Sequence, residues 1–324
     1  MSMMSQVLRC TLALLALAMP AAAISQGYPS KPVRLIVPYG VGGASDVLAR
    51  VLGAKLQAVW GQGVVVENRT GASGNIGTEM VVKAPADGYT LVLQNVSVVI
   101  NPAFLAKVPF DVQKDLTPVA LLGATPKMLA AHATLKVATL KELTEYARAN
   151  PGKLSYGSCG SGTPQHLAME LYLSQAGISM VHAPYKGCAP ALADVLGGQV
   201  PLVMLSANMV APHLAGGKLR GLAVTSKKRY RLAPEVPAFD ELGYKDFDLW
   251  TWYALMGPAG LPREVTEKLY RDVMAAVNDS DVHEKLLTAG VEDLRGDGAA
   301  LAALIRSDQA KYVQLIKKAN IKAE

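Results

Sequence analysis

Short β-branched runs followed by glycine-rich loops and helical patterns recur along this chain, and this alternation restricts the folds that it can adopt. In the first unit, residues 33–38 form an apolar run, Gly40, Gly42 and Gly43 follow, and a helical pattern begins at Ser45. Related runs begin at residues 63, 90, 154 and 180. Because strands alternate with helices, the sequence predicts an α/β fold with mostly parallel sheets.

Two β-like stretches, residues 116–131 and 219–226, are bounded by proline or basic residues and are predicted to cross between two lobes. We therefore expect a first lobe at residues 24–124, a second at 125–222, and a return to the first lobe at 223–324. Helical patterns at 263–277 and 298–318 are expected to pack on the first lobe.

The N-terminus has the pattern of an export signal. Arg9 precedes an apolar stretch from Cys10 to Met19, and three alanines at positions 21–23 form a small-residue cleavage site. The apolar stretch has about ten residues, whereas a membrane-spanning helix needs about 20. The sequence thus predicts a signal peptide at residues 1–23, a mature chain that begins at Ile24, and a location in the periplasm.

Composition and charge exclude several function classes. The chain is 51% hydrophobic and 18% charged, which indicates a substantial buried core. The formal net charge of +6 is modest, and no Lys/Arg block or interleaved aromatic residues outline a nucleic-acid face, so we expect no nucleic-acid partner. Three cysteines and five histidines show no metal-ligand spacing, so we expect neither a metal nor a cofactor.

The glycine-rich loops do not match nucleotide-binding fingerprints. A dinucleotide motif would require glycine where Ser45 and Gln165 stand, and no phosphate-binding P-loop is present. Cys159 could act as a nucleophile with the nearby His166, which would make the chain an exported hydrolase or transferase; a loop serine is a further candidate. In an oxidising compartment, however, Cys159 and Cys188 can form a disulfide, and we favour that interpretation.

Three of the loops combine small polar residues, most of them neutral, with a predicted helix start. They contain Ser45 and Asp46, then Ser73 to Asn75, and then Ser158 to Thr163. Helix N-termini offer unpaired N–H groups and a partial positive charge, so starts that converge would bind an anion without arginine. The alternative is that these residues only cap their own helices, a role for which Ser45, Asp46 and Thr163 are suitable.

The sequence at these loops resembles the Bug (TctC-like) extracytoplasmic solute receptors of tripartite tricarboxylate transporters. The resemblance rests on VRLIVPYGVGGASD at 33–46, ENRTGASGNIG at 67–77 and ADGYTL at 86–91. It continues through YGS at 156–158, GTPQHLA at 162–168, YKGCAPAL at 185–192 and GGQV at 197–200. One departure is Val41, which stands where the family is expected to have proline.

The resemblance implies a two-lobed periplasmic binding protein fold, type II-like, with a ligand cleft between the lobes and no catalytic activity. It implies a monomer that captures a small carboxylate and delivers it to membrane permease subunits. A ligand sensor for a signalling partner is the alternative. The positions expected to line the cleft are Tyr39, Gly43, Ala44, Ser45, Asp46, Ser73, Gly74, Asn75, Gln94, Asn95, Ser158, Ser161, Gly162, Thr163, Tyr185, Lys186, Ser206 and Trp252.

Three of these positions have other interpretations. We favour Asp46 as a cap or loop organiser over a direct ligand contact, because its negative charge is unsuited to an anion site. Lys186 is equally compatible with a solvated surface position. Trp252, together with Tyr253, is more typical of the core than of a cleft wall.

Overall fold

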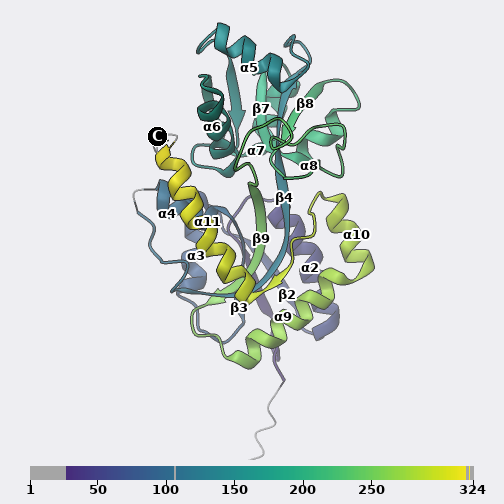
Figure 1. Cartoon of the computed structure of the whole chain (residues 1–324). Helices are drawn as coiled ribbons and strands as arrows, with labels where there is room; N and C mark the ends of the chain where they lie inside the picture. The colour runs from purple at the N-terminus through teal and green to yellow at the C-terminus, as the bar shows by residue number, and fades with distance from the viewer. Residues whose placement is uncertain (1–26, 106, 319–320, 322–324) are drawn as a thin grey trace, which may run out of the picture. The chain divides into compact units, whose positions relative to one another are not determined.

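The computed structural model describes residues 27–105, 107–318 and 321 (Figure 1). The predicted signal peptide, with Arg9, Cys10 and the alanine site, lies outside the described residues. The chain divides into a short N-terminal unit, Met1–Ser30, and a second unit, Lys31–Glu324. The description that follows concerns the second unit.

The first part of the sheet is built from the predicted strand–loop–helix units. Its strand order is β2-β1-β3-β9-β4, and β10 pairs with the outer side of β4. The strands are β1 Val33–Val37, β2 Val64–Asn68, β3 Thr90–Asn95, β4 Leu116–His132, β9 Trp250–Pro258 and β10 Gly296–Asp297. The helices that follow β1, β2 and β3 are α2 Ala44–Trp60, α3 Asn75–Val82 and α4 Ser97–Phe104, with the one-turn 3-10 helix η1 Ala72–Gly74 before α3.

The second part of the sheet continues from β4 in the order β4-β7-β5-β6, and β8 also pairs with β4. Its strands are β5 Ser155–Ser158, β6 Val181–Pro184, β7 Leu202–Ser206 and β8 Leu219–Val224. Its helices are α5 Leu140–Ala149, α6 Pro164–Ala176, α7 Cys188–Leu196 and α8 Ala207–Val210, with η2 Ala211–His213.

Strand β4 belongs to both parts of the sheet. Its first half pairs with β9 as far as Pro126, which lies opposite Trp250, and its second half pairs with β7 and β8 from Lys127 onward. The predicted crossover at 116–131 coincides with this strand. The stretch predicted as the second crossover forms β8, and the chain re-enters the first part at β9. The lobe boundaries at 124 and 222 stay a prediction.

The expectation of mostly parallel sheets is wrong for this chain. Among the described strands, four pairs are parallel and five are antiparallel. The parallel pairs are those joined by helical crossovers, as the alternating pattern requires. The antiparallel pairs all involve β4 or β9, the long strands that run between the two parts of the sheet, and their direction has no signature in local sequence patterns.

Three C-terminal helices complete the first part. They are α9 Arg263–Asn278, α10 Ser280–Thr288 and α11 Gly298–Lys318. Helix α9 packs against α2, and α11 lies against both α4 and β4 (Figure 1). Apolar residues such as Ile36, Val92 and Met256 are fully buried between these layers. None of the helices in the described residues combines the length and hydrophobicity that a bilayer-spanning segment needs.

Candidate functional site

The first glycine-rich loop ends at a helix start that has no side-chain cap among the described residues. The N-cap position of α2 is Gly43, and Ser45 and Asp46 lie inside the helix. Ser45 and Asp46 therefore do not cap α2 as the sequence suggested they could. Gly43 is exposed, while Ser45 is buried. The first turn of α2 thus presents backbone N–H groups at an accessible loop.

Asp46 organises this loop. Its carboxylate accepts hydrogen bonds from the Gly42 N–H at 3.0 Å, from Asn68 Nδ2 at 3.0 Å and from the Arg50 guanidinium, whose Nη2 lies 2.9 Å away. Burial would raise the pKa of Asp46, but the bonds from Arg50, Gly42 and Asn68 together hold it below its usual value. The carboxylate stays ionised and its charge is balanced by Arg50.

The second loop brings Tyr39, Ser73 and Gly74 together. Helix α3 begins after Gly74 with no side-chain cap in the described chain, and Ser73 and Gly74 both have positive φ, 54° and 94°. A Cβ on Gly74 would stand 3.0 Å from the Tyr39 ring, so the two residues are in close contact. Asn75, the first residue of α3, is buried. The left-handed backbone at Gly74 is one that glycine adopts without strain.

A chain of hydrogen bonds ties Tyr39 to this loop. The Tyr39 hydroxyl donates to Gln94 Oε1 at 2.9 Å, and Gln94 Nε2 donates to the Thr78 hydroxyl at 2.5 Å. Thr78 in turn donates to the carbonyl of Gly74 at 2.7 Å. Burial raises the pKa of Tyr39, so its hydroxyl stays protonated. The neighbouring Asn95 lies at the carboxyl end of β3, the same sheet edge that carries Tyr39.

The third loop lies in the second part of the sheet, between β5 and α6. Thr163 caps α6 by accepting from the His166 N–H at 3.4 Å, which confirms its cap role. The Ser158 hydroxyl accepts from the Gly160 N–H at 3.1 Å. The Gly162 N–H donates to His166 Nδ1 at 3.0 Å. The loop is therefore held in one conformation by its own polar groups.

The disulfide between Cys159 and Cys188 is confirmed, with a Cα–Cα distance of 4.2 Å. It joins the third loop to the start of α7, and the Gly187 N–H donates to the Cys159 carbonyl at 3.1 Å. Because a disulfide sulfur carries no thiol, Cys159 is not available as a nucleophile. The hypothesis of an exported hydrolase or transferase therefore loses its main candidate nucleophile.

Helix α4 connects the loops of the two parts of the sheet, a role that the sequence analysis missed. Asn101 Nδ2 donates to the Ser73 carbonyl at 3.0 Å and to Asn75 Oδ1 at 2.7 Å. One turn later, Phe104 lies against Gly162 and meets the His166 ring edge-on, with centroids 6.4 Å apart. A signal was present, because α4 follows the carboxyl end of β3, where predicted site residues also lie.

A second missed group is the stacked pair His166 and His182. Their rings are parallel, with centroids 4.0 Å apart, and Tyr156 stacks on the other face of His182. His182 Nε2 lies 2.7 Å from the Ser158 hydroxyl. The parallel register of β5 and β6 places Tyr156 opposite His182, but strand order cannot be read from the sequence alone.

The remaining predicted site residues of the second part, Tyr185, Lys186 and Ser206, lie in different environments. The Tyr185 hydroxyl donates to Asp194 at 2.7 Å, and its ring packs against Gly157. Burial and the Asp194 carboxylate raise the pKa of Tyr185 to about 12. Ser206 accepts from Gln165 Nε2 at 3.3 Å. Lys186 is exposed.

Trp252 is separated from the loops. It is 1% exposed, and its indole N–H donates to Asp308 of α11 at 2.8 Å. The next residue, Tyr253, points to the opposite face of β9, where its hydroxyl donates to Thr125 at 3.3 Å and interacts electrostatically with Tyr39. Successive side chains on a strand alternate in this way. Tyr253 is thus the aromatic residue of β9 on the side of Tyr39.

The described residues contain no group of three or more His, Cys, Asp or Glu side chains that could hold a metal ion. The three loops offer backbone N–H groups, hydroxyls and amides. Such groups bind and orient an anion or a polar solute.

Two α/β halves that share the long strand β4, with helix-start loops brought together by α4, define the class of two-lobed solute-binding proteins. Comparison with known proteins gives the family. The chain belongs to the tripartite tricarboxylate transporter family receptors (TctC), whose family model matches residues 48–321. This is the Bug/TctC family of solute-binding receptors, which are not enzymes.

Individual relatives are similar to this chain in sequence over almost its whole length. BugT from Bordetella pertussis is 34% identical over 297 residues, which cover 91% of this chain and 91% of BugT. The structure of Rpa4515 from R. palustris with adipate is 32% identical with a TM-score of 0.85, and the match covers 92% of this chain and 100% of that one. MatC from Rhodopseudomonas palustris with bound malate is 27% identical with a TM-score of 0.81, covering 89% and 100%.

Proposed function

We propose that this receptor captures a small carboxylate in a cleft between its two lobes and delivers it to the membrane permease of a tripartite tricarboxylate transporter. The proposal rests on one observation: helix-start loops from the two parts of the sheet are brought together by α4. Two helices of the first part, α2 and α3, begin at Gly43 and Gly74 without side-chain caps in the described chain, and α4 links the α3 loop to the loop at Ser158–Thr163. Helix starts of this kind favour an anionic ligand.

The carboxylate is held in this proposal by neutral donors. The arginines next to the loops are already engaged: Arg50 binds Asp46, and Arg69 binds Glu67 at 2.7 Å. Arg34 binds the same Glu67 carboxylate at 2.7 Å. Each of these guanidinium groups would have to give up a carboxylate partner in order to bind the ligand. Neutral N–H and hydroxyl groups can change hydrogen-bond partners without leaving a buried charge unpaired.

The ligand class is proposed from the neighbours. Adipate and malate, named with two similar solved structures, are both small dicarboxylates. The proposed cleft is lined by Tyr39, Gly43, Ala44, Ser45, Asp46, Ser73, Gly74, Asn75, Gln94, Asn95, Ser158, Ser161, Gly162, Thr163, Tyr185, Lys186 and Ser206. Within this set Asp46 acts by organising the first loop. Trp252 lies outside the set and supports β9 from its far side.

The receptor is proposed to work in the periplasm after removal of residues 1–23. The basis is the apolar stretch after Arg9, the alanine site, and the periplasmic origin named for neighbours such as BugD. The lobes are proposed to meet at about the boundaries predicted from the sequence. Intact-mass measurement of the periplasmic fraction should find Ile24 as the first residue. A chain that retains residues 1–23 would contradict this part of the proposal.

Calorimetric titration tests the binding site. A thermal-shift panel of small carboxylates first identifies the cognate ligand, which at 100 times its dissociation constant should stabilise the fold by about 2.7 kcal/mol. Ser73→Ala and Ser161→Ala should then weaken binding roughly ten- to a hundredfold, because a hydrogen bond to a charged group contributes about 1.5 to 3 kcal/mol. Arg69→Gln is the matched control and should change affinity far less. If Arg69→Gln abolishes binding while both serine variants bind normally, the neutral-donor site is wrong.

Delivery to a permease is tested apart from binding. Deletion of the gene should abolish uptake of the labelled cognate carboxylate by intact cells, and the wild-type gene should restore it. Uptake that is unchanged in the deletion strain, in spite of tight binding by the purified protein, would favour the sensor role instead.

A further inference from the structure

Lys127 is a lysine with 0% exposure at the point where β4 passes from one part of the sheet to the other. The residue before it, Pro126, pairs with Trp250 of β9, whereas Lys127 itself pairs with Ser206 of β7. Lysine is almost never fully buried without a partner. Its position at the change of pairing therefore calls for an explanation.

Lys127 holds the connecting segments together. Its Nζ donates to the Leu249 carbonyl at 3.0 Å, just before the chain enters β9. Its backbone N–H donates to the Thr225 hydroxyl at 2.9 Å, and its carbonyl accepts from the Thr225 N–H at 2.9 Å. Residues 127, 225 and 249 lie on the segments that connect the two parts of the sheet. The buried residue Lys127 thus joins, through hydrogen bonds, the segments that connect the two parts of the sheet.

The charged groups around Lys127 are on α11 and on the segment before β9. Asp308 attracts the ammonium, and Lys311 repels it. Asp308 also accepts from the Trp252 indole and lies near Asp248, and burial raises the pKa of its carboxyl. Tyr312 faces the same carboxyl. Burial dominates over these interactions and lowers the pKa of Lys127 to about 7.

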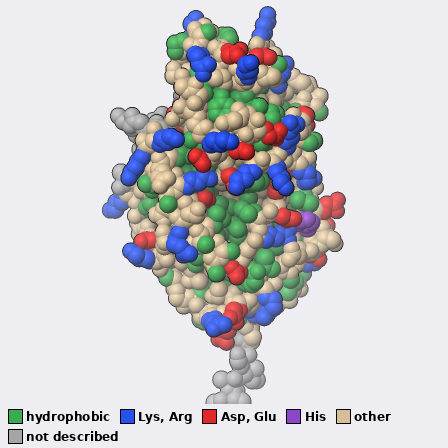
Figure 2. All heavy atoms as spheres, viewed as in Figure 1, with side chains coloured by type: hydrophobic (Ala, Val, Ile, Leu, Met, Phe, Trp, Pro, Cys, Tyr) green, Lys and Arg blue, Asp and Glu red, His purple; other side chains and the backbone are tan. Residues whose placement is uncertain are grey.

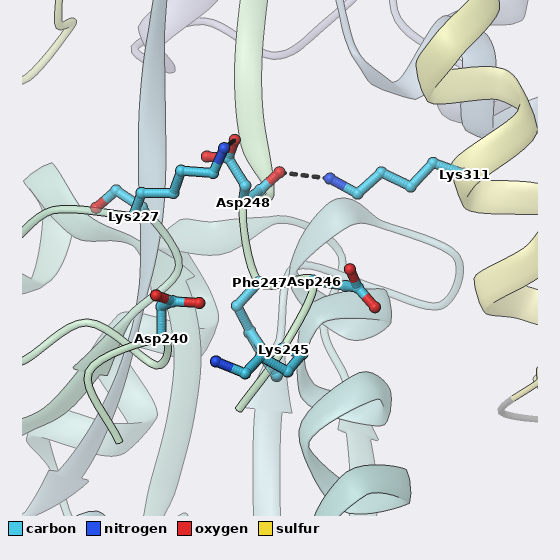
Figure 3. A pocket seen from close by; sticks show the side chains of 8 residues that line it. Lys227, Asp240, Lys245, Asp246, Phe247, Asp248 and Lys311 are labelled. Atoms are coloured by element: carbon cyan, nitrogen blue, oxygen red, sulfur yellow. Dashed lines mark hydrogen bonds and ion pairs between the residues drawn. The ribbon is translucent and has the colours of Figure 1, made fainter. Parts of the chain in front are cut away.

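A cavity of about 370 Å³ lies beside this junction (Figure 3). Its lining includes Ser226 and Asp248, which are the neighbours in sequence of Thr225 and Leu249. Lys227 and Lys311 both extend toward Asp248, and Lys311 Nζ donates to the Asp248 carbonyl at 2.5 Å. The polar lining suits water, and it adjoins in sequence Thr225 and Leu249, two residues that contact Lys127.

In the described part of the chain, the face of the molecule in Figure 2 has no large patch of a single charge sign. On the face in Figure 2, acidic and basic side chains are interspersed across the middle of the molecule. In the cavity itself, Lys227 pairs with Asp248 at 3.4 Å. The state of Lys127 is therefore set by its access to water more than by long-range charge.

We propose that Lys127 is a proton-linked hinge residue: its side-chain amine becomes hydrated and takes up a proton when the two lobes open, and the resulting ammonium releases that proton when they close. The proposal concerns the motion of the fold and does not depend on which ligand binds.

The direction of the pH effect follows from linkage. A hydrated lysine in the open form has a pKa near 10.4, whereas the buried lysine has a pKa of about 7. Between these two values, each pH unit downward favours opening by up to tenfold, and below about pH 7 the effect levels off because Lys127 is protonated in both forms. Rising pH should therefore favour the closed form.

Hydrogen exchange of the unliganded protein tests the proposal, because it detects rare opening. The probes are the amides of Thr225 and Leu249, with rates corrected for the intrinsic effect of pH. Protection of these amides should rise by up to roughly a hundredfold from about pH 7 to about pH 9 in the wild type. In Lys127→Met the protection should be the same at both pH values. Lys227→Met is the matched control, because Lys227 lines the same cavity and is not among the charges that act on Lys127, and it should keep the wild-type dependence.

The Lys127→Met variant should fold, because the Leu249 carbonyl keeps a hydrogen bond from the Thr225 hydroxyl at 2.8 Å. The amide of Ile36 in β1 reports global unfolding and should exchange more slowly than the hinge amides. Equal rates for Ile36 and the hinge amides would mean that only global unfolding occurs, and this would overturn the proposal. So would protection that does not change with pH in the wild type, or a full pH dependence in Lys127→Met.

Discussion

Phe104 of α4 lies against Gly162 of the loop before α6, so that a Cβ on Gly162 would overlap the aromatic ring. The two residues belong to different parts of the sheet and are 58 positions apart in the sequence. Gly162 also has a φ of +72°, which favours glycine. The loop that carries Ser161 can therefore approach α4 only when position 162 has no side chain.

Gly162→Ala should destabilise the protein by about 1 to 3 kcal/mol, because the new methyl group would force Phe104 or the loop to move. Denaturant unfolding measures the loss. In the double variant with Phe104→Ala, the cost of the alanine should fall to the backbone contribution of about 1 kcal/mol. Additive effects of the two substitutions would show that the ring is not the obstacle.

Thr163→Ala should lower the stability by about 1 kcal/mol, since it removes the side-chain cap of α6. Ser45→Ala is the matched comparison, because Ser45 lies inside α2 and does not cap it. We expect the serine variant to change the free energy of unfolding by less than about 0.5 kcal/mol. Equal losses in the two variants would contradict the cap assignment.

Removal of the disulfide by Cys159→Ser together with Cys188→Ser should cost about 3 to 4 kcal/mol, because the bond closes a loop with a sequence separation of 29. Thermal unfolding with and without reductant checks this value. The double serine variant should not respond to reductant. Labelling of the denatured, unreduced mature protein should find no free thiol.

Glu67 should make the stability depend on acidic pH. Hydrogen bonds from Arg34 and then Arg69 hold the pKa of Glu67 to about 2, below the usual 4.5. A depressed pKa in the folded state contributes stability above about pH 4.5 and loses it as the pH falls toward 2. The wild type should therefore exceed Glu67→Gln in stability at about pH 5, and the difference should shrink at about pH 2.5. A difference that is constant with pH would show that the ion pairs contribute nothing.

Local sequence patterns predicted the units that carry the loops, since glycine clusters and β-branched runs act over a few residues. The disulfide was also predictable, because the N-terminal pattern indicated export to an oxidising compartment and only Cys159 and Cys188 lie after the predicted signal peptide. The cap assignment of Ser45 failed for a physical reason. Gly43 takes the N-cap position, and Asp46 is drawn to Gly42, Asn68 and Arg50 instead.

Contacts between distant segments could not be predicted in the same way. Whether Trp252 or Tyr253 faces Tyr39 depends on the register of β9 against β3 and β4, which is set by tertiary pairing. In the local sequence, Phe104 is an ordinary apolar residue at a helix end. Its contact with Gly162 depends on a loop from another part of the sheet. Lys127 has no local signal at all, since a lysine in a strand is usually expected at the surface.

The strand order β3-β9-β4 has a consequence for how the chain assembles. During synthesis from the N-terminus, β3 and β4 are complete long before Trp250–Pro258 is made. Until then, the edges of β3 and β4 that pair with β9 have no hydrogen-bond partner. The first part of the sheet can close only when β9 inserts between β3 and β4 and bonds on both sides. Such distant pairing makes folding slow and leaves unpaired edges exposed in the meantime. A chain that ends before residue 250 should therefore aggregate rather than form a stable half-molecule.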